Sequence, residues 1–216
     1  MSTIPHVRGL SERLRTDTAD AHRQAEESGF VDALLAGELP IEAYAELLAQ
    51  SYLIYEALER VGAESADDPI VAEFLADELL RVPALEADLA HLRGAGWRET
   101  LTALPATARY VERIESARTD PAVFVAHHYI RYLGDLSGGQ IIRRKVGDAY
   151  GLTGDGVRFY IFDEIPKPKP FKDAYRASLD AAPFDDLQAQ RIVDEVTAAY
   201  ELNRALFADL DEFARR

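Results

Sequence analysis

Residues 127–140 read His127-His128-Tyr129-Ile130-Arg131-Tyr132-Leu133-Gly134-Asp135-Leu136-Ser137-Gly138-Gly139-Gln140. Apolar side chains around them recur every three or four residues, which predicts one long helix from about Asp120 to Tyr150. Each of the three glycines costs roughly 1 kcal/mol relative to alanine inside a helix. Gly134 and Gly138 fall on one face, together with Arg131, and present bare backbone one turn apart. Such a face suits either a close crossing of two helices or a flat ligand lying against a helix that bends at 137–139.

The rest of the chain shows the same helical spacing and no convincing alternation of apolar and polar residues. Prolines and glycines divide it into predicted helices at about residues 9–27, 40–61, 67–94 with a kink or split at Pro83, 105–117, 120–150, 171–179 and 185–210. Residues 151–156 are expected to form a loop, and Pro166-Lys167-Pro168-Lys169-Pro170 a stiff extended connector. The best strand candidate is the short aromatic run 158–162. The sequence therefore predicts an all-α single domain over residues 1–216, with a core at about 9–211.

Charge and composition exclude several classes of function. The 216 residues carry 24 Lys and Arg against 38 Asp and Glu, a formal net charge of −14 at pH 7, so the chain should repel nucleic acid and anionic membranes. The absence of cysteine excludes thiolate nucleophiles and cysteine-ligated zinc or iron–sulfur clusters. No apolar run approaches the roughly 18 residues of a membrane span, and the N-terminus lacks the pattern of a signal peptide. We therefore expect a soluble cytoplasmic protein with no stable membrane anchor.

The first predicted helix carries a candidate metal ligand. Its inner stripe continues with the small residues Thr18, Ala21 and Ala25 around His22, which leaves room beside the imidazole. Glu26 lies four residues after His22, so the two side chains share a face. A carboxylate in that position can accept one imidazole N–H and leave the other ring nitrogen for a metal. The spacing alone is more typical of a surface His–Glu pair, so both interpretations stay open here.

Basic residues gather in one short part of this acidic chain. They are Lys167, Lys169, Lys172 and Arg176, and the last two share a helical face. Arg15 lies seven residues before His22 and shares the face of that histidine. A solvated basic face is the default interpretation. In a chain of net charge −14, however, this is also where an anionic ligand or an acidic partner would be directed.

Two polar residues lie where apolar ones would be expected. Asp135 borders the bare glycine face and could relay a proton to a ligand there. Asn203 interrupts an apolar stripe on the last predicted helix and needs either an interhelical hydrogen bond or a water network. Together these features are a histidine, a bare glycine face, a nearby acid and a basic rim. They suit a planar, anionic, metal-bearing ligand held between two helices, which points to haem.

Five segments resemble the haem oxygenase family. The glycine-rich run 129–140 is similar to the signature of that family, and Thr18-Ala19-Asp20-Ala21-His22-Arg23-Gln24-Ala25-Glu26 is similar to its proximal-histidine segment. Further similar segments are 52–59, 171–176 and 203–210, so the resemblance extends from about residue 10 to residue 210. It implies an all-helical fold in which haem is sandwiched between the first helix and a kinked glycine-containing helix.

The resemblance also implies roles for individual residues. His22 would be the proximal iron ligand, with Glu26 as its hydrogen-bonding partner. The flexible distal wall would be formed by three glycines: Gly134, Gly138 and Gly139. A distal water network would be anchored by Asp135 and include Tyr55, Arg131 and Asn203. The haem propionates would meet Arg15, Tyr129, Lys172 and Arg176. Arg15 stands where the family would place lysine, but the positive charge is kept.

The implied reaction is the reductive, O2-dependent cleavage of haem at a meso carbon to biliverdin, carbon monoxide and ferrous iron, through a ferric hydroperoxide. Electrons would come from an external reductase containing flavin or an iron–sulfur cluster, because the chain lacks a nucleotide-binding glycine fingerprint. Arg143, Arg144, Lys145 and the cluster at 167–176 are candidate docking surfaces for it. The chain stops at Arg216, without the membrane tail of the animal enzymes, which suggests a soluble bacterial form. A haem carrier without turnover is the main alternative, and a plain helical interaction module is the other.

Overall fold

The computed structural model describes residues 8–215, except for the side chain of Glu26. It contains the α-helices α1 (Leu10–Asp17), α2 (Ala19–Glu26), α3 (Gly29–Leu35), α4 (Ile41–Glu64), α5 (Pro69–Phe74), α6 (Val82–Arg93), α7 (Pro105–Glu115), α8 (Pro121–Asp135), α9 (Gly139–Tyr150), α10 (Pro168–Ala181) and α11 (Asp186–Ala214). Four short 3₁₀ helices join them: η1 (Asp77–Leu79), η2 (Trp97–Thr100), η3 (Ser116–Thr119) and η4 (Arg158–Tyr160). No strand occurs between residues 8 and 215, so the all-α prediction is confirmed.

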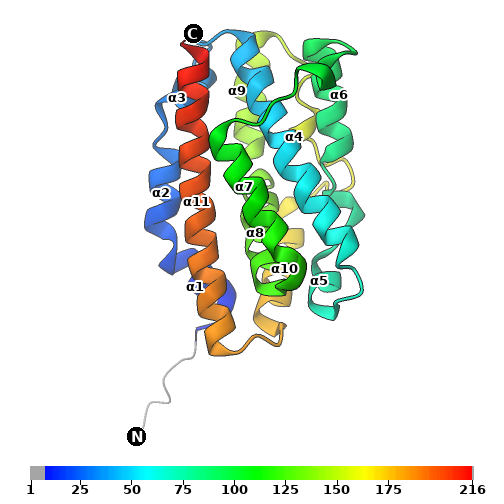
Figure 1. Cartoon of the computed structure of the whole chain (residues 1–216), viewed down its shortest axis with the longest axis vertical. Helices are drawn as coiled ribbons and strands as arrows, with labels where there is room; N and C mark the ends of the chain where they lie inside the picture. The colour runs from blue at the N-terminus through cyan, green and yellow to red at the C-terminus, as the bar shows by residue number, and fades with distance from the viewer. Residues whose placement is uncertain (1–7, 216) are drawn as a thin grey trace, which may run out of the picture.

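The two longest helices, α4 and α11, organise the packing. Figure 1 shows α11 running along the molecule with α2 and α3 beside it, and α11 also packs against α7 and α8. α4 packs against α6 and α7 on the other side. α8 is buried along most of its length, which follows from its apolar residues and its two histidines. α8 packs against α11 along this buried length, whereas Gly134 and Ser137 at its glycine-rich end are exposed.

The predicted first helix is interrupted at Thr18. There the backbone leaves the helical region, with φ −105° and ψ 6°, and the Thr18 hydroxyl donates a 2.5 Å hydrogen bond to the Leu14 carbonyl. A β-branched residue that bonds back to its own helix bends or ends it. The prediction of one continuous helix over 9–27 was therefore wrong, and α2 takes a direction of its own toward the middle of α11.

The glycine-containing helix breaks where its sequence predicts a bend. α8 ends at Asp135 and α9 begins at Gly139. At the break the Ser137 hydroxyl donates to the Leu133 carbonyl over 2.7 Å, and the Gly138 amide donates to the Gly134 carbonyl over 2.8 Å. The Gly138 bond keeps the regular four-residue spacing of a helix, but the Ser137 amide donates to the same Gly134 carbonyl from three residues away, over 3.1 Å, so the helix tightens into a turn where α8 ends.

Three other segments differ in detail from their predictions. Residues 166–170 do not form an extended connector, because α10 already begins at Pro168, and proline is well suited to the first turn of a helix. The aromatic run 158–162, the best strand candidate in a sequence where strands are improbable, forms no strand: its first three residues form η4, and Phe159 and Tyr160 are buried. The predicted helix 67–94 is split as expected, but the split lies at residues 75–81, directly before Pro83, which occupies the first turn of α6.

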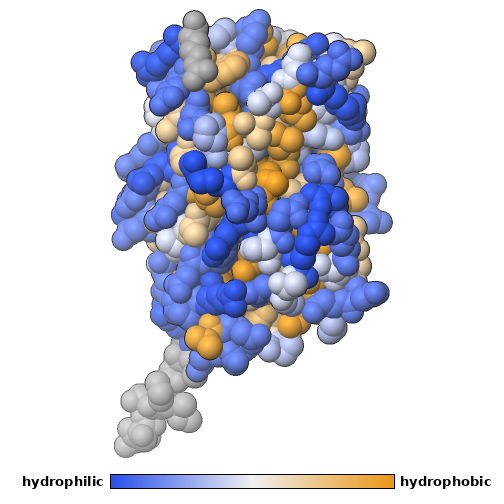
Figure 2. Space-filling view, in the orientation of Figure 1, coloured by the Kyte–Doolittle hydropathy of each residue, from blue (hydrophilic) through white to orange (hydrophobic). Residues whose placement is uncertain are grey.

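The surface is mostly hydrophilic. Figure 2 shows charged and polar side chains over most of the visible face, with apolar groups between them. The large apolar side chains exposed within residues 8–215 are Leu80, Ile141 and Leu187. None of the described helices is both long and apolar enough to cross a membrane.

Candidate active site

A cavity of about 280 Å³ lies between α2 and the end of α8. It is lined by His22, Tyr129, Ile130, Leu133, Gly134, Ser137, Gly138, Arg176 and Tyr200. These residues come from α2, α8, the break after α8, α10 and α11, so four distant parts of the chain meet there. The cavity brings together the histidine, two of the glycines and one of the cations that the sequence predicts to act together.

His22 is exposed on the cavity side of α2. Its ring meets the ring of Tyr200 edge-on, with centroids 5.2 Å apart and planes 75° apart. The small residues of α2 keep the helix close to α11, while the imidazole reaches the cavity wall opposite α8. The side chain of Glu26 lies outside the described part of the chain, so its pairing with His22 stays a prediction.

Gly134 and Gly138 present bare backbone to open space. A Cβ atom built on Gly134 would meet no atom within 4 Å, and one built on Gly138 would come no nearer than 3.7 Å to the Gly134 carbonyl oxygen. At a close crossing of two helices, such an atom would collide with the second helix. The glycine face is therefore an open wall, and the helix-crossing interpretation fails.

Gly139 does not belong to that wall. It is buried, and a Cβ atom there would lie 3.1 Å from Cδ1 of Tyr160. One residue corresponds to a rotation of about 100° along a helix, so Gly138 and Gly139 face different sides. Gly139 allows the aromatic ring of Tyr160 to pack behind the wall, and its predicted contact with a ligand stays a prediction.

Asp135 lies directly after the first wall glycine and receives a hydrogen bond from the Tyr55 hydroxyl. Tyr55 is fully buried, and its ring packs edge-on against Tyr132 and Phe159. Burial raises the pKa of Asp135 to about 6, although the charge of Arg131 and the Tyr55 hydrogen bond oppose the rise. A carboxyl group with a pKa near neutrality can both give and take a proton at physiological pH.

Arg131 connects Asp135 with the last helix. It donates a 2.9 Å hydrogen bond to Oδ1 of Asn203, and its guanidinium lies 4.9 Å from the ring centre of Tyr55. It also lies 5.6 Å from the ring centre of Tyr110, a residue that sequence reasoning missed. Among residues 8–215, the Tyr110 hydroxyl and Nε of Arg131 are buried without a hydrogen-bond partner. Unpartnered buried donors of this kind mark places where ordered water binds.

Sequence reasoning also missed the pair formed by His127 and Glu195. His127 lies one helical turn before Arg131 on α8. The buried ring of His127 lies 3.0 Å from Glu195 through Nε2, and Arg113 donates to the same carboxylate. Burial acts to raise the pKa of Glu195, but the hydrogen bonds from His127 and Arg113 outweigh it and lower that pKa to about 2. No local signal identifies Glu195, because it lies 68 residues from His127 in the chain.

Cations border the cavity on the side of α10. Arg176 lines it, and Lys172 donates a 2.9 Å hydrogen bond to the Ser137 hydroxyl at the helix break. Burial raises the pKa of Tyr129, and the charges of Arg176 and Arg15 oppose that rise, so both arginines act on this side of the cavity. Lys169 does not line the cavity and forms an exposed ion pair with Asp173, to which Arg176 also pairs over 3.3 Å. The predicted basic cluster therefore divides, and Lys172 and Arg176 form its cavity-facing part.

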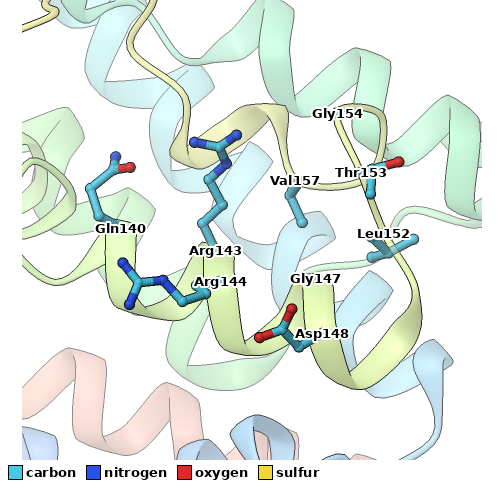
Figure 3. Close-up of a pocket in the computed structure, with 9 residues that line it drawn as sticks. All are labelled: Gln140, Arg143, Arg144, Gly147, Asp148, Leu152, Thr153, Gly154 and Val157. Carbon is cyan, nitrogen blue, oxygen red and sulfur yellow. The ribbon is translucent and has the colours of Figure 1, made fainter.

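A larger cavity of about 370 Å³ lies between α9 and the loop that follows it (Figure 3). Gln140, Arg143 and Arg144 line it from α9, and Leu152, Thr153 and Val157 line it from the loop. It contains none of the residues that surround His22. We therefore place the candidate active site in the smaller cavity, which has the histidine and the open glycine wall.

Comparison with known proteins agrees with this geometry. The family model for heme oxygenase matches residues 8–209. The chain is 41% identical to heme oxygenase 1 of a Nostoc species, over 94% of this chain and 86% of that protein. It is 37% identical to human heme oxygenase 1, over 94% of this chain and 72% of that protein.

Solved structures give the same result. The crystal structure of heme oxygenase-2 from a Synechocystis species, in complex with heme and NO, superimposes with a TM-score of 0.92 at 34% identity and covers 96% of this chain and 87% of that one. Heme oxygenase from Leptospira interrogans gives a TM-score of 0.88 at 35% identity, covering 93% of this chain and 98% of that one. The similarity extends over nearly the whole fold, including both walls of the cavity. The chain therefore belongs to the haem oxygenase family.

Proposed function

We propose that this chain binds haem between α2 and the end of α8 and cleaves it, with O2 and external electrons, to biliverdin, carbon monoxide and ferrous iron. Haem is the substrate and also supplies the iron at which oxygen is activated. The observation that carries the proposal is the wall at Gly134 and Gly138, where bare backbone faces open space across a cavity that His22 also lines. A flat macrocycle fits against such a wall, and an added side chain would occupy its place.

His22 would hold the iron through its imidazole, as the axial ligand on the α2 side. The propionates would meet Lys172 and Arg176 at the cavity rim, together with Arg15 and the hydroxyl of Tyr129. Charge-assisted hydrogen bonds of this kind fix the orientation of an anionic ligand. The rotation of haem about the His22 axis, and therefore the choice of the carbon that is attacked, would depend on these contacts.

Asp135 would hold the proton that the reaction needs. Its carboxyl group lies next to the glycine wall, and the Tyr55 hydroxyl fixes its orientation. Because Gly134 and Gly138 lack side chains, no acidic group of the wall reaches the ligand directly, and the proton would pass through ordered water. Tyr110, Arg131 and Asn203 offer the polar atoms to which such water can bind.

Electrons would reach the site from a flavin- or iron–sulfur-containing protein. Arg143, Arg144 and Lys145 are exposed on α9 and form no ion pair with the described side chains, and the exposed Ile141 lies beside them. α9 begins directly after the glycine wall, so a donor bound there would lie near the haem edge. Charge reversal of Arg144 should slow electron transfer more at low than at high salt, because screening removes a docking contribution of this kind.

A turnover assay tests the proposal. The purified protein is mixed with hemin, a reductase system and air, while absorbance and released carbon monoxide are followed. We expect loss of the haem absorption band, growth of the biliverdin spectrum and about one carbon monoxide per haem, by the stoichiometry of the reaction. A stable complex with an unchanged haem band would instead identify a carrier. Absence of imidazole-ligated haem would contradict the binding site itself.

A further inference from the structure

A buried carboxylate outside the active site holds the loop that supports the glycine wall. Asp88 of α6 has no exposed surface. Its Oδ1 accepts hydrogen bonds from the amides of Gly156 and Arg158 over 2.8 and 3.0 Å, and its Oδ2 accepts one from Phe159 over 2.8 Å. Three backbone donors from one short segment thus converge on a single side chain. Segment 156–160 is consequently fixed to α6 through its amides.

Carbonyls of the same segment and of the residue that follows it are held from the N-terminal end of α6. Arg81 donates to the carbonyl of Ile161 over 2.6 Å and to that of Phe159 over 3.4 Å. The Arg81 guanidinium also lies 3.9 Å from the ring centre of Phe162. The segment therefore lies between an anion that accepts from its amides and a cation that donates to its carbonyls.

The far side of segment 156–160 touches the active site at two points. The ring of Phe159 packs edge-on against Tyr55, the residue that donates to Asp135, with ring centres 5.3 Å apart. Tyr160 packs against Gly139, and its carbonyl accepts a 2.7 Å hydrogen bond from Nε2 of Gln140. Segment 156–160 thus contacts both the partner of Asp135 and the first turn of α9, which follows the break.

The three hydrogen bonds accepted by Asp88 require a carboxylate. Two acceptor oxygens can serve three converging amide donors, whereas an asparagine has one acceptor and would turn an N–H₂ group toward at least one of them. No arginine or lysine forms an ion pair with Asp88 in the described chain, since Arg158 pairs with Asp155 instead. Burial raises the pKa of Asp88, and the three backbone hydrogen bonds oppose that rise. The hydrogen bonds of the Asp88 carboxylate therefore all go to segment 156–160.

We propose that Asp88 is a positioning residue for haem cleavage, which acts through segment 156–160 to hold the start of α9 and the Tyr55 side chain. The inference rests on the proposed function and deepens it. Loss of the carboxylate leaves three amides of segment 156–160 without their acceptor, so the segment is held only through its carbonyls, by Arg81 and by the Tyr44 hydroxyl, and it loosens. Tyr160 then no longer supports Gly139, and Phe159 no longer supports Tyr55. The break at 136–138 becomes mobile, and the water that Asp135 orients loses its fixed place.

The test compares two variants with a matched control. Asp88→Asn removes the carboxylate, and Gln140→Leu removes the link between Tyr160 and α9 while leaving Asp88 in place. Asp209→Asn is the control, because Asp209 also accepts a backbone amide, that of Ala106 over 2.7 Å, but does so at the start of α7. Two readouts are measured: amide hydrogen exchange of Gly138, Ile141 and Ile142 in the haem-free protein, and biliverdin formation with hemin.

We expect both variants to speed exchange of these three amides by about tenfold or more, because the local opening that exposes them becomes easier. Biliverdin formation should fall by about tenfold while the haem dissociation constant is unchanged, as misplacement of a reacting group predicts. Asp209→Asn should change neither readout. If Asp88→Asn fails to fold, Asp88→Glu, which keeps the charge but displaces the carboxylate by one methylene, replaces it, and unchanged exchange in that variant together with Gln140→Leu overturns the inference.

Several results would overturn the inference. Unchanged exchange in the folded variants would show that segment 156–160 does not hold α9. If Asp209→Asn changed amide exchange and biliverdin formation equally, Asp88 would contribute only to the general stability of the fold. Faster exchange with undiminished biliverdin formation would remove its role in the reaction. Failure of the wild-type protein to form biliverdin would contradict the proposed function, whereas the exchange measurement on haem-free protein would still decide whether Asp88 holds the break.

Discussion

Asp135→Asn should make the haem-free protein more stable, and more so at neutral than at acidic pH. Burial raises the pKa of Asp135 from its ordinary 3.8 to about 6. The folded state therefore holds this proton more tightly than the unfolded state. As pH rises from 4 through 6, the folded protein must give up a proton that the unfolded chain has already lost, so wild-type stability falls across this window. Asparagine removes that penalty.

The size of this stability difference follows from the pKa shift of Asp135. A difference of about two units at roughly 1.4 kcal/mol per unit gives a penalty of about 3 kcal/mol, as an upper limit, once the pH exceeds both pKa values. At pH 4.5 the same two pKa values give a penalty of only about 1 kcal/mol. Asp135→Asn should therefore gain about 2 kcal/mol more, relative to wild type, at pH 7.5 than at pH 4.5. The gain appears because the Tyr55 hydroxyl can still donate to the asparagine oxygen.

Urea unfolding of the haem-free protein at the two pH values measures this difference. Tyr55→Phe provides the contrast, since it removes the hydrogen bond that favours the ionised carboxyl group and should make the pH dependence steeper. An equal stability difference between wild type and Asp135→Asn at pH 4.5 and 7.5 would refute the reasoning. It would mean that the carboxyl group is solvated in the folded state and is not poised to hold a proton near neutral pH.

Further predictions concern the cavity walls and rim. His22→Ala should keep part of its haem affinity through packing and the propionate contacts but lose the imidazole-ligated absorption spectrum and turnover; unchanged turnover would remove His22 as the iron ligand. Gly134→Ala should stabilise the haem-free protein by roughly 0.5–1 kcal/mol in thermal unfolding, because its Cβ meets open space, yet weaken haem binding by about tenfold or more in a hemin titration. Gly139→Ala should instead destabilise the haem-free protein, because its Cβ would press on Tyr160, and a neutral effect would contradict the packing behind the wall. Lys172→Met should weaken haem binding by about fivefold at low salt and less at high salt, which an affinity independent of salt would disprove.

Local sequence determined most helix positions, the break after α8 and the face shared by two glycines. Helical spacing and the prolines at helix starts predict most of the helices, and the three glycines predict the break between α8 and α9 because each disfavours a continuous helix. The 100° turn per residue places Gly134 and Gly138 on one face. The interruption at Thr18 and the early start of α10 escaped prediction, because a single side-chain hydrogen bond or proline position shifts a helix end.

Tertiary structure decided everything that depends on distance across the fold. Whether the glycine face crosses a helix or faces open space follows from where α2 and α11 lie, and no spacing along α8 contains that information. Tyr55 and Asp135 are 80 residues apart, and Asp88 meets segment 156–160 across about 70. The raised pKa of Asp135 arises from burial, which many helices create together. The sequence therefore determines which side chains are present and which share a helical face. Packing determines which partners those side chains have, how far they are buried and how tightly they hold a proton.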